Sequence, residues 1–261
     1  MREQQLAPAA APDVGVQKQF WNSWIADNLE RESLDSLTLK PGETALRLLS
    51  GLQLSSPKIL EVGCANGWLS AALAKFGQVT GVDLADEAIA VARARHPEAA
   101  FIAGDFLTAE LPVGHFDVLV SLSVISFCVD QPQFVDRVFE LLRPGGYLIL
   151  TCPHRFIWDR TDFVRQSNGE IPLNWLNMGE LKRLLRHRLS ILQAETIIPA
   201  GNRGILRLIN SYRLNKMIHK IVPEPSVIRL KEKMGLGRTL IVQAQKPATP
   251  PEHAALSATK R

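Results

Sequence analysis

The sequence is poor in cysteine and contains no long apolar run. Its three cysteines, Cys64, Cys128 and Cys152, lie far apart, with no CxxC spacing and no neighbouring pair of histidines. That pattern argues against both a disulfide framework and a zinc site, so we expect no bound metal. No stretch approaches the roughly 20 consecutive apolar residues of a bilayer-spanning helix, so we expect no transmembrane segment. The opening residues, MREQQLAPAAAP, lack the apolar stretch of a secretory signal, which favours a cytoplasmic protein.

The composition is that of a folded domain with a substantial core. The chain has 261 residues, of which 46% are hydrophobic and 21% are charged. It contains no internal repeat of the kind that builds solenoids. Both ends are rich in alanine or proline and have little to bury. We therefore expect residues 1–17 and 246–261 to be disordered and residues 18–245 to form one domain.

The net charge of +4 hides an asymmetry between the two halves of the chain. Residues 1–150 carry 11 Lys and Arg against 18 Asp and Glu, whereas residues 151–261 carry 19 against 8. An acidic half suits a cationic ligand, and a basic half suits an anionic substrate, an acidic partner protein or a membrane surface. The alternative is that the basic side chains are simply solvated on helix exteriors.

Short apolar segments alternate with helical patterns along most of the chain, which predicts an α/β fold with a parallel sheet wrapped by helices. The expected strands are residues 58–62, 78–83, 100–104, 116–122, 147–152, 191–198 and 239–244. The expected helices are residues 43–52, 68–76, 87–95, 133–142 and 179–188. The helix at 133–142 is expected to stop at the Arg-Pro-Gly-Gly turn that follows it. Two insertions, residues 153–177 and 199–237, interrupt the alternation and are expected to form lids.

A glycine-containing loop follows the first expected strand. A dinucleotide-binding GxGxxG motif would place glycines at positions 63, 65 and 68, but Ala65 and Trp68 occupy two of them. The GxGxG spacing, with Gly63 and Gly67, departs only at Ala65 and by one methyl group. The loop therefore predicts a ligand site at a helix N-terminus, with a tight structural turn as the alternative.

Acidic residues follow the next two expected strands. Asp83 ends the second strand, where a carboxylate can accept hydrogen bonds from both hydroxyls of a ribose, although it could also cap the next helix. Asp105 follows the third strand, where it can accept a hydrogen bond from the exocyclic amine of a purine, and Phe106 can pack its ring against the base. Because the carboxyl ends of parallel strands meet at one edge of a sheet, we expect these side chains to converge.

These motifs resemble those of class I S-adenosylmethionine-dependent methyltransferases. The resemblance covers roughly Ile59 to Cys152 and rests on EVGCANG, VTGVDLADEAIAVARAR, FIAGDF, FDVLVSLSVI and LRPGGYLIL, in that order. It implies a doubly wound, Rossmann-like sheet of about seven strands with the last one antiparallel, and helical lid insertions. It also implies an enzyme with S-adenosylmethionine as its cofactor.

The resemblance assigns a role to each motif. Glu61, Gly63 and Gly67 would shape the methionine pocket, and Ser121 would lie near the methionine moiety. Asp83 would bind the ribose, and Asp105 with Phe106 would hold the adenine. The residues that the resemblance assigns to the cofactor are Trp21, Glu61, Gly63, Ala65, Gly67, Asp83, Leu84, Asp105, Phe106 and Ser121.

Two features beside the motifs bear on the cofactor site. Ala65 replaces the usual glycine, and we expect the change to be tolerated with a mild effect on cofactor affinity. The segment Phe20-Trp21-Asn22-Ser23-Trp24 resembles the aromatic lid that closes over the cofactor in members acting on small molecules. Its alternative is a hydrophobic staple on the outer face.

Removal of a proton from an amine or hydroxyl acceptor benefits from a general base. Among the six histidines, only His154 directly follows the fifth expected strand, at the edge where an acceptor would sit. We therefore predict that His154 contacts the acceptor, with a hydrogen bond inside the loop as the alternative.

The sequence of the second insertion predicts an amphipathic basic segment. Ile205, Leu208, Ile209 and Tyr212 fall at helical spacing, with basic residues between them. The favoured interpretation is a lid packed on the core through these apolar residues. The alternatives are a docking surface for an acidic carrier protein or anionic substrate, and a membrane-surface helix. Because aromatic residues are not interleaved with the basic ones, we do not expect a nucleic-acid substrate.

The function that we predict is methyl transfer from S-adenosylmethionine to oxygen or nitrogen of a small organic acceptor, with S-adenosylhomocysteine as product. A place in secondary metabolism follows by analogy alone. One alternative is an enzyme that uses the same cofactor for a non-methylating cyclisation or elimination. Another is a non-catalytic cofactor-binding module that docks an acidic partner. The sequence leaves a homodimer open.

Overall fold

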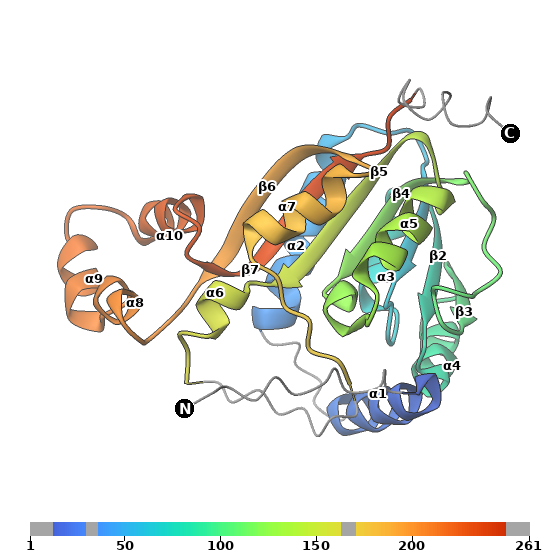
Figure 1. The fold of residues 1–261 in the computed structure, drawn as a ribbon, viewed down its shortest axis with the longest axis horizontal. Helices are drawn as coiled ribbons and strands as arrows, with labels where there is room; N and C mark the ends of the chain where they lie inside the picture. Colours follow the sequence, from blue (N-terminus) through green and yellow to red (C-terminus); the bar gives the residue numbers. More distant parts are fainter. Residues whose placement is uncertain (1–12, 30–35, 163–170, 249–261) are drawn as a thin grey trace, which may run out of the picture.

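The computed structural model describes residues 13–29, 36–162 and 171–248, which fold around one seven-stranded sheet (Figure 1). The strand order is β3-β2-β1-β4-β5-β7-β6. The strands are β1 (Lys58–Val62), β2 (Gln78–Asp83), β3 (Ala100–Ala103), β4 (Phe116–Leu122), β5 (Leu142–Pro153), β6 (Ser190–Pro199) and β7 (Gly237–Gln245).

The pairing directions confirm the predicted fold class. Strands β1 to β5 are parallel, with Ile59 opposite both Val79 of β2 and Val118 of β4. Strand β7 runs antiparallel between β5 and β6. The parallel strands therefore end at one common edge, where the glycine loop and the acidic residues of the sequence motifs emerge. We call it the carboxyl edge.

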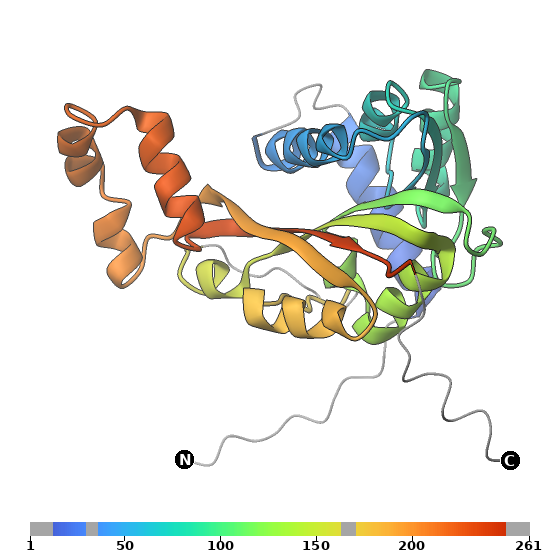
Figure 2. The same ribbon diagram turned by 90° about the horizontal axis from the view of Figure 1, so that it is seen from above.

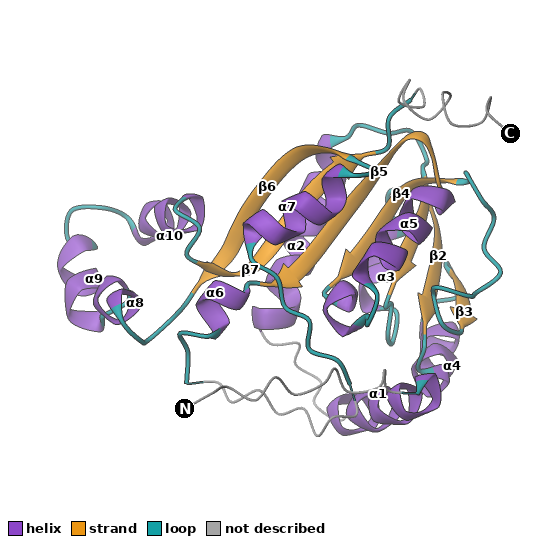
Figure 3. Ribbon diagram, viewed as in Figure 1, coloured by secondary structure: helices purple, strands orange, loops and turns teal. Residues whose placement is uncertain are grey.

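Helices cover both faces of the sheet (Figures 2 and 3). On one face, α2 (Ser36–Gly51) and α3 (Trp68–Leu73) bury one apolar cluster against the central strands. On the other, α5 (Gln131–Leu141) and α7 (Met178–Arg186) bury a second and larger cluster. The remaining helices near the carboxyl edge are α1 (Val14–Leu29), α4 (Asp86–Arg95), α6 (Arg155–Trp158) and the 3-10 turn η1 (Val124–Phe127).

Strand β5 begins earlier than predicted. Helix α5 does end before the Arg-Pro-Gly-Gly segment, but these residues extend the strand rather than form a separate turn. Arg143 forms an ion pair with Asp117. The N–H of Gly145 donates to the carbonyl of Lys246 at 3.0 Å. Pairing with residues far away in the sequence therefore decides the conformation of this segment.

The regular structure of the described chain begins with helix α1 and ends with strand β7. Helix α1 begins at Val14, so the predicted disordered segment 1–17 is wrong for its last residues; residues 1–12 lie outside the described chain. Strand β7 ends at Gln245, and of the predicted tail only residues 246–248 are described. Within the described residues, no helix is long and apolar enough to span a membrane.

The second insertion packs on the rest of the fold through only part of the predicted apolar face, since Ile209 adjoins a small cluster of Ile157, Leu206 and Leu236. It forms three short helices, α8 (Ile205–Ile209), α9 (Tyr212–Ile218) and α10 (Glu224–Lys233), which project beyond the end of the sheet (Figures 1 and 2). Ile205, Leu208 and Tyr212 are exposed, and Leu206 is the buried side chain of α8. The break at Asn210 and Ser211 between α8 and α9 interrupts the helical spacing on which the prediction rested.

Candidate functional site

The glycine loop joins β1 to α3 at the carboxyl edge. Gly63, Ala65 and Gly67 all have a positive φ, at 79°, 46° and 83°. A side-chain carbon at Gly63 would lie 2.2 Å from Cγ2 of Val124, so only glycine fits there. Ala65 adopts the left-handed conformation that glycine usually supplies, and its Cβ makes that conformation less favourable than it would be for glycine.

The carboxylate of Asp83 ties the second strand to this loop. It accepts hydrogen bonds from the N–H of Ala65 at 2.8 Å and from the N–H of Ala85 at 2.9 Å. The alternative role as a helix cap is not seen, because the N-cap of α4 is Ala85. Burial raises the pKa of Asp83, while these backbone N–H groups oppose the shift. Leu84, half-buried, follows it at the same edge.

A second carboxyl lies inside the site. Glu61 on β1 is 3% exposed and accepts a hydrogen bond from Ser70 of α3. Burial raises the pKa of Glu61 to about 8; the Ser70 hydrogen bond lowers it, and the nearby Asp83 raises it further. Burial also raises the pKa of the Cys64 thiol, and both carboxyls add to that rise. The glycine loop therefore lies beside two acids whose charges are poorly solvated.

The neighbouring strand ends carry the other predicted residues. Ser121 on β4 is fully buried, and its hydroxyl oxygen has no hydrogen-bond partner in the described chain. Asp105 accepts a hydrogen bond from the N–H of Leu107 at 3.0 Å and so orders the turn after β3. Phe106 is 7% exposed, and its ring packs on Phe134 with centroids 5.1 Å apart. Core packing therefore holds this ring in place, and its contact with an adenine stays a prediction.

Helix α1 lies against the glycine loop and the start of α4. Trp21 and Ala65 pack on one small cluster that includes Ile25. The ring of Trp21 also meets Phe127 of η1 edge to face, with centroids 4.8 Å apart. Trp21 of the predicted aromatic lid thus lies beside the loop, whereas Trp24 is exposed.

Two polar contacts that sequence reasoning missed hold α1 in place. Lys18 pairs with Asp86 at 2.6 Å, and the side-chain amide of Asn22 donates to the same carboxylate at 2.9 Å. The hydrogen bonds from Lys18 and then Asn22 lower the pKa of Asp86 to about 2. No local pattern links residues this far apart in the sequence, although an acid in the first turn of α4 is a visible helix-start signal.

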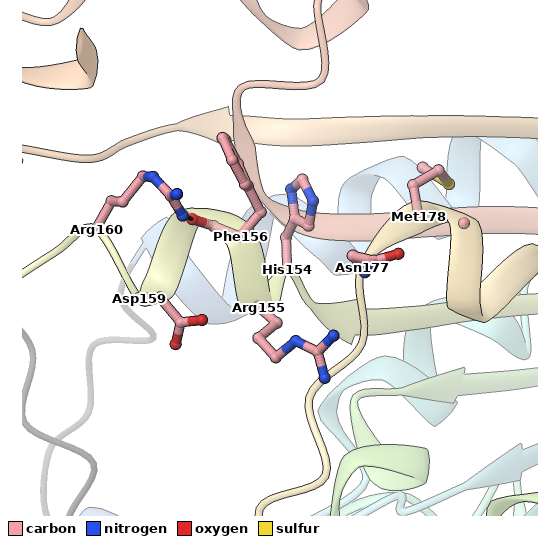
Figure 4. A pocket seen from close by; sticks show the side chains of 8 residues that line it. His154, Arg155, Phe156, Asp159, Arg160, Asn177 and Met178 are labelled. Atoms are coloured by element: carbon pink, nitrogen blue, oxygen red, sulfur yellow. Dashed lines mark hydrogen bonds between the residues drawn. The ribbon is translucent and has the colours of Figure 1, made fainter. Parts of the chain in front are cut away.

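His154 stands at the end of β5, as predicted. It lines a cavity of about 450 Å³ together with Arg155, Phe156, Asp159, Arg160, Asn177, Met178 and Gly179 (Figure 4). Its imidazole is 6% exposed, and Nδ1 lies 3.0 Å from the carbonyl oxygen of Gly237. Because that carbonyl is an acceptor, Nδ1 carries the proton, and Nε2 is left as the basic nitrogen. Burial lowers the pKa of His154, against the opposing effect of the Gly237 hydrogen bond, and so favours the neutral ring.

The cavity has two sides. His154 and Phe156 point toward β7, whereas Arg155 and Asp159 point the opposite way (Figure 4). Arg155 forms an ion pair with Glu180 of α7. Cζ of Arg160 lies 4.0 Å from the ring centroid of Phe156. Sequence reasoning missed these arginines, whose only signal was their closeness to His154.

Comparison with known proteins finds relatives for the part of the chain that contains the glycine loop and strands β1 to β5. Residues 60–150 match the family described as methyltransferase domain. The chain is 33% identical over 133 residues to a probable S-adenosylmethionine-dependent methyltransferase of Mycolicibacterium smegmatis, and the matched region covers 49% of each chain. It is 30% identical over 142 residues to a ubiquinone biosynthesis O-methyltransferase of Psychrobacter cryohalolentis, covering 51% of this chain and 52% of that one. The chain thus matches about half the length of these curated relatives.

Solved structures share the fold over nearly the whole chain. The [4+2]-cyclase SpnF superposes with a TM-score of 0.62 and 16% identity, covering 92% of this chain and 98% of that one. A sequence identity this low is evidence for a shared fold and for nothing more. The family match covers β1 to β5, the strands that build the glycine-loop site, and on that ground the chain contains a class I S-adenosylmethionine-dependent methyltransferase domain.

Proposed function

We propose that the chain transfers the methyl group of S-adenosylmethionine to an oxygen or nitrogen atom of a small organic acceptor, releasing S-adenosylhomocysteine. The observation that carries the proposal is the pair of carboxyls beside the glycine loop, the buried Glu61 and the half-buried Asp83 that binds the N–H of Ala65. A ligand with ammonium and sulfonium groups brings positive charge to these acids, whereas a dinucleotide would bring a pyrophosphate against Glu61.

The residues present fit this cofactor. The unpartnered hydroxyl of buried Ser121 offers a polar contact at the methionine end of the site. Asp83 can accept hydrogen bonds from ribose hydroxyls while it holds Ala65, because each carboxylate oxygen has two lone pairs. Asp105 would face the adenine amine, and Trp21 would cover the site. Once bound, the cofactor supplies an electrophilic methyl group.

On the acceptor side, the protein's contribution is alignment and exclusion of water. We assign the acceptor to the cavity at the end of β5, since β5 is the neighbour of β4 in the sheet. Nε2 of the neutral His154 would take the proton of an amine or hydroxyl acceptor. The hydrogen bond from Nδ1 to Gly237 would hold the ring in the required tautomer.

The test is incubation of the purified protein with methyl-labelled S-adenosylmethionine and a metabolite extract, followed by mass spectrometry. The proposal requires labelled product and an equal amount of S-adenosylhomocysteine. Binding of the cofactor without release of S-adenosylhomocysteine in any extract would overturn it and favour the non-catalytic module.

A second candidate is a cyclisation or elimination in the same pocket. It is supported by the fold shared with a protein described as a [4+2]-cyclase. Conversion of an acceptor without methyl transfer would favour it. An anionic or carrier-bound acceptor, secondary metabolism, a cytoplasmic location and a homodimer stay predictions of the sequence.

A further inference from the structure

Residues 199–237, which we call the arm, form a separate lobe at the carboxyl edge. The arm leaves the sheet at Pro199 of β6 and returns at Gly237 of β7. Both ribbon views show α8, α9 and α10 projecting past the strands, away from the helices that cover the two faces (Figures 1 and 2). Their outward sides are therefore open to solvent or to a partner.

The arm exposes most of its large apolar side chains. The most exposed is Ile221, at 87%, followed by Tyr212 at 76%. The apolar side chains of the arm that are between 59% and 87% exposed are Ile205, Leu208, Tyr212, Met217, Ile221, Leu230 and Met234. The surface of a folded protein rarely has so many exposed apolar side chains in one region unless that region binds something.

Polar contacts inside the arm hold this arrangement in place. The ammonium of Lys231 donates to the side-chain oxygens of Asn210 at 3.1 Å and of Asn215 at 2.9 Å, and so joins α10 to α8 and α9. The hydroxyl of Thr196 on β6 donates to the carbonyl of Glu232 at 2.7 Å. Leu206 turns inward on Ile157. These contacts therefore hold the exposed apolar side chains of the arm in a defined arrangement.

The arm is also strongly basic. It contains eight basic residues against two acidic ones, Glu224 and Glu232, for a net charge of +6 (8 minus 2). The basic residues are Arg203, Arg207, Arg213, Lys216, Lys220, Arg229, Lys231 and Lys233. All except Lys231 are exposed, and Arg203 is paired with Asp162. Exposed cations therefore share the arm with the exposed apolar side chains.

We propose that the arm docks on the surface of a bilayer rich in anionic lipids. Exposed Leu, Ile and Met among Lys and Arg are the composition of a segment that lies in the membrane interface, with its apolar side chains among the acyl chains and its cations at the headgroups. Lys216 and Tyr212 illustrate how a cation and an apolar side chain lie together on the arm, with Nζ of Lys216 5.7 Å from the ring centroid of Tyr212.

The same observations fit other occupants less well. A second copy of the arm would bring two charges of +6 together, and protein interfaces are depleted in lysine. A single-stranded nucleic acid would need aromatic stacking platforms, and Tyr212 is the only aromatic residue of the arm. A fluid bilayer, in contrast, accepts projecting side chains without a matching groove.

The experiment is flotation of the full chain with vesicles of phosphatidylcholine alone or of phosphatidylcholine with phosphatidylglycerol. We expect flotation with the anionic vesicles only, and loss of most of it at high salt because screening weakens the headgroup contacts. The measurement needs neither cofactor nor acceptor, so its outcome is independent of the proposed methyl transfer.

Two sets of substitutions test the two parts of the surface. Replacement of Arg213, Lys216 and Lys220 by Gln should lower the partition coefficient at least about 10-fold. Replacement of Leu208, Met217 and Ile221 by Ser should lower it by a similar factor while leaving the thermal unfolding midpoint unchanged, since these side chains are exposed.

Matched controls lie elsewhere on the surface. The basic control replaces Lys75, Arg95 and Arg186 by Gln, and the apolar control replaces Val113 and Leu192 by Ser; all are exposed. These controls should float like the parent protein. Absence of flotation with anionic vesicles at low salt, or equal losses in the arm and control variants, would overturn the proposal. So would light scattering showing that the apolar arm substitutions convert a stable dimer to a monomer.

Discussion

The sheet and the arm place their apolar side chains in opposite environments. In the sheet, β4 and β5 bury nearly every apolar side chain, and Leu119 and Leu148 are fully enclosed. In the arm, Leu206 is enclosed whereas Leu208, two residues later, is 62% exposed. The difference teaches that helical spacing of apolar residues predicts an apolar face but not what covers it.

The largest expected effect contrasts one buried and one exposed side chain. Phe134→Ala should lower the free energy of unfolding by about 3–5 kcal/mol, because the fully buried ring fills the core against Phe106. Leu208→Ala in the arm should change it by less than about 0.5 kcal/mol. Urea titration measures both free energies; similar losses would mean that Leu208 packs on the core after all.

His154 joins the two regions, since it bonds Gly237 at the base of the arm. If Nε2 accepts the acceptor's proton, His154→Gln should lower turnover about 100-fold and leave cofactor affinity nearly intact. Single-turnover kinetics and calorimetry separate the two quantities. Unchanged turnover would restrict His154 to its hydrogen bond with Gly237.

Asp83 tests whether the glycine-loop site holds the cofactor. Asp83→Ala should weaken S-adenosylmethionine binding by about 1–3 kcal/mol, because hydrogen bonds to a charged group are lost along with the tie to Ala65. Asp159→Ala, at the acceptor cavity, is the matched control and should bind the cofactor normally. If calorimetry finds the same cofactor affinity for the parent protein and both variants, Asp83 does not bind the cofactor.

The pH dependence of stability should reveal the buried Glu61. Its pKa is about 8 in the folded protein, against 4.5 for an ordinary glutamate, so the folded state keeps a proton that the unfolded chain releases. The unfolding free energy should therefore fall as pH rises from about 4.5 to about 8, by on the order of 1 kcal/mol or more. Glu61→Gln should flatten that slope in urea titrations, leaving the smaller contribution of Asp83, whose pKa is raised as well. An unaltered slope would contradict the assignment.

The sequence by itself determined the sheet and the positions of the site residues. Turn glycines, acids after apolar segments and alternation of strands with helices are local signals, and parallel strands necessarily bring their carboxyl ends together. For this reason Gly63, Asp83, Asp105 and His154 are found at the edge where we predicted them.

Only the tertiary structure decided which contacts these residues make. It turned the ring of Phe106 into the core, tied Asp83 to Ala65, and held α1 through Asp86. It also left the apolar side chains of the arm outside. Each outcome depends on groups that meet across the fold, and the free energy of such contacts is not encoded in the spacing of neighbouring residues.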